Sequence, residues 1–237
     1  MSSLRFTRSY SITNPNDEDH TSNGRCPNYA LLWDITQNNV HWPTGHDYFV
    51  GNGSDIIDGT RELREILSER LRKGIITKNL LFCDLDGVLA DFEKGVEEKF
   101  KKNICDIRPS TLWSVINKST TFFENLPWMP KGRELWERIK EYHPIILTGV
   151  PPGCPTASEQ KKRWCQRELG EDISVITCLT NDKAKYCFDR SILIDDRLTV
   201  LNSWKDKGGK CILYDEENLY TNLERIDRYM DYDVYSP

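Results

Sequence analysis

The sequence lacks the features of several large protein classes. Its longest apolar runs, such as 79–83 and 144–147, are far shorter than the roughly 20 residues that span a bilayer, so we expect no membrane-spanning helix. It has no basic excess, because the net charge is −5, so a general nucleic-acid binder is not expected. With 38% hydrophobic and 29% charged residues, its 237 residues fit an ordinary globular protein and exclude collagen-like, wholly disordered and coiled-coil classes.

The cysteines form no recognisable metal or disulfide framework. The eight are scattered, without a Cys-x-x-Cys pair or zinc-type spacing to a histidine, and no secretory-type apolar segment follows the start. We therefore expect a reducing compartment and a cytoplasmic location. The alternative is mitochondrial, because residues 1–16 carry Arg5, Arg8 and four serines before the first acid, Asp17.

The chain divides into three predicted segments. Residues 1–25 are polar and without periodicity, which indicates a flexible tail. Residues 26–78 form an extension of unknown role, and residues 79–237 form the main domain. The extension ends in an amphipathic helix that begins near Thr60, closes at Gly74 and carries four apolar residues at helical spacing, namely Leu63, Ile66, Leu67 and Leu71.

From residue 79 onward, strand-like runs alternate with amphipathic stretches. The runs lie at 79–83, 144–148, 174–178, 191–194 and 210–214. Buried strands separated by helices predict an α/β fold with a doubly wound parallel sheet. Residues 92–130 interrupt this rhythm with helical, aromatic-rich sequence, so we predict a small helical cap inserted after the first strand.

Polar groups follow four of these strands, where a parallel sheet binds its ligands. They are Asp84 and Asp86, then Thr148 and Gly149, then Lys183, and finally Asp195 and Asp196. Each alone is typical of an ordinary turn, helix cap or solvated charge, but their order at successive strand ends is more specific. Four clustered carboxylates require a cation, and oxygen ligands favour Mg²⁺. A hydroxyl, an amide and an ammonium suit phosphate oxygens, so the set predicts phosphoryl transfer.

These motifs resemble those of haloacid-dehalogenase-superfamily phosphohydrolases over about residues 79–214. The motifs are Asp84-Leu-Asp86-Gly-Val, Ile146-Leu-Thr148-Gly149, Lys183 and Ile194-Asp195-Asp196. Within the superfamily, Phe122-Phe-Glu-Asn-Leu-Pro127 and Leu179-Thr-Asn-Asp-Lys183 are similar to stretches of the 5′(3′)-deoxyribonucleotidases.

The resemblance implies Mg²⁺-dependent hydrolysis of a phosphomonoester through an aspartyl-phosphate intermediate. Asp84 would be the nucleophile, and Asp86 would act as general acid and then general base. Asp84, the Asp86 carbonyl and Asp196 would hold Mg²⁺ with Asp195 close by, although which of the last two ligates directly stays open. Thr148, the Gly149 amide and Lys183 would bind the phosphoryl group.

The cap is expected to select the substrate, a small phosphorylated molecule and most simply a nucleotide. Phe92, Trp113 and Phe122 fall at or near places where the nucleotidases hold the base, although these rings could instead pack the cap. One departure follows Thr148, where the nucleotidases offer Ser, Pro and a nearby Lys, whereas this chain has Gly149-Val-Pro-Pro-Gly153. The missing cation would have to come from Lys161 or Lys162.

Other functions remain open at this stage. The same chemistry could act on a sugar phosphate, a phosphoprotein or a nucleic-acid end phosphate. A non-catalytic regulatory or binding protein on the same scaffold is the alternative of another class. The sequence leaves open a homodimer and the preference for ribo- or deoxyribonucleotides.

Overall fold

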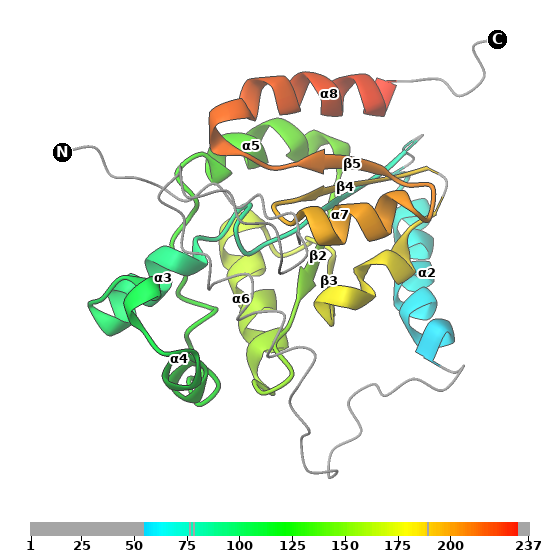
Figure 1. Cartoon of the computed structure of the whole chain (residues 1–237). Coiled ribbons are helices and arrows are strands. Elements are labelled where there is room, and N and C mark those ends of the chain that lie inside the picture. Colours follow the sequence, from blue (N-terminus) through cyan, green and yellow to red (C-terminus); the bar gives the residue numbers. More distant parts are fainter. Residues whose placement is uncertain (1–54, 76, 78, 189, 232–237) are drawn as a thin grey trace.

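A computed structural model describes residues 55–75, 77, 79–188 and 190–231, in which five parallel strands form one sheet (Figure 1). The strand order is β3-β2-β1-β4-β5. The strands are β1 (Leu80–Cys83), β2 (Ile145–Gly149), β3 (Val175–Cys178), β4 (Ser191–Asp195) and β5 (Lys210–Leu213). The predicted α/β fold with a parallel sheet is confirmed, and each strand lies within one or two residues of its predicted run.

Helices cover both faces of this sheet. Successive residues of a strand point to opposite faces, so Leu81 and Cys83 pack into one hydrophobic cluster while Leu80 and Phe82 pack into another. The first cluster includes residues of α5 (Gly132–Ile139), α6 (Ala157–Leu169) and α8 (Leu219–Asp231). The second includes residues of α2 (Asp55–Arg72), η3 (Thr180–Tyr186) and α7 (Leu198–Lys205). The sheet is therefore doubly wound, as the burial of β1 on both faces requires.

Between β1 and α5 the chain forms the helices of the predicted cap. These are α3 (Phe92–Phe100), η1 (Ile104–Asp106) and α4 (Pro109–Ile116), and α3 and α4 lie beside the sheet rather than over it (Figure 1). Asp91 starts α3 by accepting a hydrogen bond from the Lys94 amide. The boundaries predicted for the cap, 92–130, stay a prediction.

The helix predicted after Thr60 is α2, which begins earlier, at Asp55. Its buried Leu63 packs into the second cluster, with Ile66 and Leu67 against it, so this helix belongs to the folded core. Gly74 follows with φ +72°, a conformation that favours glycine. The predicted tail 1–25 and the extension as far as residue 54 lie outside the described residues.

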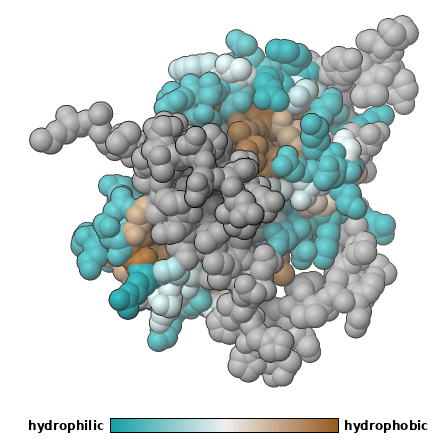
Figure 2. Space-filling view, in the orientation of Figure 1, coloured by the Kyte–Doolittle hydropathy of each residue, from teal (hydrophilic) through white to brown (hydrophobic). Residues whose placement is uncertain are grey.

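On the face that Figure 2 shows, the described residues are mostly hydrophilic, with small hydrophobic areas. None of the helices in the described part of the chain is long and apolar enough to cross a membrane. Six cysteines of that part have free thiols, and three of these are buried, namely Cys83, Cys154 and Cys165.

Candidate active site

Three aspartates meet at the carboxyl ends of β1 and β4. Asp84 follows β1, Asp195 ends β4 and Asp196 comes next, and their nearest carboxylate oxygens all lie within 4.8 Å of one another. The parallel register explains the meeting, because Cys83 lies opposite Ile194 and the Asp84 amide donates to the Ile194 carbonyl at 2.9 Å. Asp84 and Asp195, which follow Cys83 and Ile194, must therefore lie side by side at the edge of the sheet.

Lys183 of η3 joins the same cluster from the end of β3. Its Nζ lies 2.7 Å from Asp84 Oδ1 and 2.7 Å from Asp195 Oδ2, and its side chain is 1% exposed. Asp84 Oδ1 also accepts the Leu85 amide at 2.8 Å. Lys183 therefore forms two buried ion pairs that join the carboxylates at the ends of β1 and β4.

Three buried carboxylates lie close together in this cluster, and the Lys183 ammonium binds two of them, Asp84 and Asp195. Burial raises the pKa of Asp195 to about 7, because the relief from Lys183 does not offset it and Asp84 and Asp196 add repulsion. For Lys183, burial alone would lower the pKa, but the two carboxylates beside it raise it overall. The donor set is all oxygen and its three carboxylates lie within reach of one ion, so Asp84, Asp195 and Asp196 suit a divalent metal ion.

A second buried lysine, Lys161 of α6, gathers the groups that follow β1 and β2. Its Nζ lies 2.6 Å from Asp86 Oδ2 and donates to Thr148 Oγ1 at 3.0 Å and to the Gly149 carbonyl. Its side chain is fully buried, whereas Lys162 is partly exposed and lies 3.9 Å from Glu159. Of the two lysines named for the missing cation, Lys161 is therefore the one whose ammonium lies beside Thr148, and its role toward a phosphate stays a prediction.

Two glycines shape the loops around these groups. Gly87 has φ +87°, which lets the chain turn directly after Asp86. A Cβ at Gly149 would collide with the Thr180 side chain, so glycine is needed where β2 ends against η3. The close approach of these two elements brings Thr148 and Lys183 to the same edge of the sheet.

The aromatic residues of the cap form one buried cluster. The Phe92 ring centroid lies 6.0 Å from that of Trp113, 5.5 Å from that of Phe122 and 6.2 Å from that of Phe123. In this arrangement the rings pack on one another, and a base-binding role for Phe92, Trp113 and Phe122 stays a prediction. Phe123 contacts the site directly, because Lys161 Nζ lies 5.0 Å from its ring centroid.

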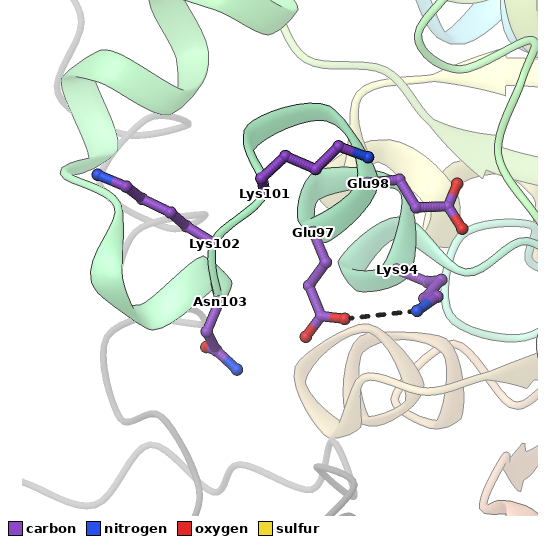
Figure 3. A pocket seen from close by; sticks show the side chains of 6 residues that line it. All are labelled: Lys94, Glu97, Glu98, Lys101, Lys102 and Asn103. Carbon is purple, nitrogen blue, oxygen red and sulfur yellow. Dashed lines mark ion pairs between the residues drawn. The ribbon is translucent and has the colours of Figure 1, made fainter.

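A surface cavity of about 370 Å³ lies away from these groups, at the end of α3 (Figure 3). Its lining consists of Lys94, Glu97, Glu98, Lys101, Lys102 and Asn103. Lys94 and Glu97 form an ion pair of 3.8 Å across it, and no strand-end residue lines it. The candidate site is therefore the buried edge of the sheet rather than this cavity.

Comparison with known proteins gives one curated relative. No protein-family model matches the chain. A Bordetella pertussis protein named "Putative 5'(3')-deoxyribonucleotidase" is 26% identical over 170 residues, which covers 63% of this chain and 88% of that protein. It confirms the resemblance to the 5′(3′)-deoxyribonucleotidases that the motifs indicate.

Solved structures of other proteins are similar to this chain at lower sequence identity. A Had-superfamily hydrolase from Ehrlichia chaffeensis is 15% identical, covers 66% of this chain and 100% of its own, and has a TM-score of 0.39. A hydrolase from Streptococcus pneumoniae is 13% identical, covers 63% and 100%, and has a TM-score of 0.38. Scores of this size carry no conclusion, so the fold assignment rests on the strand order described above.

The raised pKa of Asp195 predicts how the stability of the metal-free protein depends on pH. Burial raises the pKa of Asp195 from 3.8 to about 7, so the folded chain holds this proton more tightly than the unfolded chain. The free energy of unfolding should therefore fall as the pH rises from 3.8 to about 7. MgCl₂ should stabilise the protein more at the upper end than at the lower, since metal and proton compete for the same oxygens.

Thermal unfolding in EDTA and in MgCl₂ across this pH range checks both statements. Asp195→Asn is the informative variant, because it removes the titrating group. An unchanged slope of stability against pH in that variant would contradict the assignment to Asp195.

Proposed function

We propose that the chain is a Mg²⁺-dependent phosphomonoesterase that works through an aspartyl-phosphate intermediate on a nucleoside monophosphate or a similar small phosphate. The observation that carries the proposal is the meeting, at one buried edge, of two reactive aspartates with two buried lysines. Asp84 is bound to Lys183, and Asp86 is bound to Lys161. The printed name of the curated relative supports the nucleotide class of substrate.

In the first step a carboxylate oxygen of Asp84 attacks phosphorus. The bond from phosphorus to the ester oxygen breaks as the new bond forms, and Asp86 gives its proton to the departing alcohol. Thr148, Lys183 and Lys161 would bind the phosphoryl oxygens, whose negative charge suits two ammonium groups and a hydroxyl.

In the second step Asp86 takes a proton from a water molecule, whose oxygen attacks phosphorus. The bond from Asp84 to phosphorus breaks, inorganic phosphate leaves and Asp86 is protonated again for the next turnover. Asp84, the Asp86 carbonyl and Asp196, with Asp195 beside them, would hold the Mg²⁺. When bound, the ion supplies positive charge that stabilises the phosphoryl oxygens.

The ion pair between Lys161 and Asp86 links substrate binding to the general acid, because Lys161 Nζ lies 2.6 Å from Asp86 Oδ2 and 3.0 Å from Thr148 Oγ1. A phosphate dianion placed beside Thr148 would compete for the same ammonium. Substrate binding would therefore rearrange the hydrogen bonds of Asp86, the group that passes a proton to the leaving alcohol.

Asp84→Asn should abolish Mg²⁺-dependent turnover of a generic aryl phosphate, because an amide is not a competent nucleophile for this step. The matched control is Asp206→Asn, since Asp206 is exposed at the end of α7 and should tolerate the change. Initial rates with both variants give the comparison. If the intact protein shows no turnover of any phosphate, the non-catalytic alternative is the better explanation.

Lys161→Met should lower kcat/KM by about 100-fold, the size of effect seen when one charge-stabilising donor is removed from an active site. Lys162→Met is the control, because the neighbouring ammonium is partly exposed and pairs with Glu159 at 3.9 Å. Inhibition by inorganic phosphate should weaken in the first variant alone. Equal behaviour of the two variants would remove Lys161 from the proposed phosphate site.

A substrate panel separates the nucleotide from the other phosphates. Nucleoside monophosphates should be preferred over sugar phosphates, phosphopeptides and end-phosphorylated oligonucleotides. Trp113→Leu or Phe122→Leu should reduce that preference by about 5- to 150-fold if the ring stacks on a base, since such stacking is worth about 1–3 kcal/mol. Equal hydrolysis of all these classes would rule out nucleotide selection while leaving the phosphatase chemistry intact.

A further inference from the structure

A fully buried glutamine, Gln160, stands next to Lys161 on α6 and binds the end of the cap. Its Oε1 accepts the Phe123 amide at 2.9 Å. Its Nε2 donates to the Ser119 carbonyl at 2.9 Å and to Thr156 Oγ1 at 2.7 Å. The side chain thus uses its acceptor and both donor hydrogens, and two of its three partners lie on the segment that ends the cap.

Consecutive residues of α6 hold Phe123 in two different ways. Gln160 binds its backbone amide, and Lys161 Nζ lies 5.0 Å from the centroid of its ring. The same Nζ binds Asp86 Oδ2 and Thr148 Oγ1. The distance between the aromatic cluster and the candidate phosphate site is therefore set by two neighbouring side chains of one helix.

Gln160 is the first member of a docking stripe on α6, which consists of Gln160, Trp164 and Glu168. Trp164 Nε1 donates to the Leu126 carbonyl at 2.8 Å, and Glu168 Oε2 accepts Trp128 Nε1 at 2.7 Å. These three side chains are spaced four residues apart, so they share one face of the helix. Gln160 is the member adjacent in sequence to the lysine of the site.

We infer that Gln160 is a positioning residue, which fixes Phe123 and the aromatic cluster against Lys161 and thereby contributes to substrate selection. The selection part rests on the proposed function, whereas the positioning part rests on the hydrogen bonds alone. Without the Gln160 amide, the buried Phe123 N–H loses its acceptor, and the Ser119 carbonyl keeps the longer contact of 3.5 Å from Thr156 Oγ1. The penalty for such a buried, unsatisfied group favours opening of the cap segment.

Gln160→Met tests this inference, because methionine has similar length and flexibility but cannot form the hydrogen bonds. Gln166→Met is the matched control, since Gln166 is exposed on the same helix. Deuterium exchange in peptides that cover residues 119–126 should become faster by on the order of tenfold in the first variant alone.

Kinetics of the same variant separate selection from general damage. For a nucleoside monophosphate, kcat/KM should fall by about tenfold, mainly through KM, whereas for 4-nitrophenyl phosphate it should fall by less than about threefold. Unchanged exchange would overturn the inference. Faster exchange with equal losses on both substrates would show a merely structural role, and would overturn it as well.

Thr156→Val gives a second, milder variant in case the methionine variant does not fold. It removes only the Oγ1 atom that accepts from Gln160 Nε2 and leaves the bonds of Gln160 to Phe123 and Ser119, so its exchange should be intermediate. If the wild-type protein hydrolyses neither substrate, the proposed function fails. The exchange experiment then still decides whether Gln160 fixes the cap segment.

Discussion

Burial of charge at the carboxyl edge of the sheet is the constraint on which the rest of the structure depends. Asp84 and Asp195 share Lys183 with Asp196 beside them, and removing an ionised group from water costs several kcal/mol even after relaxation. A flexible loop would relax by exposing these groups. Here they follow strands whose residues pack into hydrophobic clusters on both faces, so the core holds the charges together.

The two buried lysines divide the aspartates into two electrostatic environments. Lys183 binds Asp84 and Asp195 at the ends of β1 and β4, whereas Lys161 approaches from α6 and binds Asp86. Asp84 and Asp86 are two residues apart, yet each lies against a different ammonium. Separate environments allow neighbouring carboxylates to take different roles, such as those proposed above for a nucleophile and a carrier of protons.

The sequence predicts those parts of the site that follow from sheet geometry. Because parallel strands end at a common edge, the sequence alone predicts that four residues lie close together, namely Asp84, Thr148, Lys183 and Asp195. Lys161 could only be suggested, because its burial depends on the rotation of α6 about its axis and on the cap that covers it. A run such as Gln160-Lys161-Lys162-Arg163 has the composition of a solvated helix face, and nothing in its spacing shows which member turns inward.

The rotation of α6 also links the two parts of the proposed site, the group that binds Asp86 and the residues that hold the cap. Lys161 stands one position along from Gln160, so a helix turned far enough to release one residue displaces the other. The docking stripe and the site lysine therefore move as a unit, and the cap cannot shift along α6 without changing the ammonium that binds Asp86. If the cap were held only by surface loops, the position of the cap and the position of the Lys161 ammonium could change independently. Here a substitution at Gln160 is expected to reach the proposed reacting groups through the adjacent residue, Lys161.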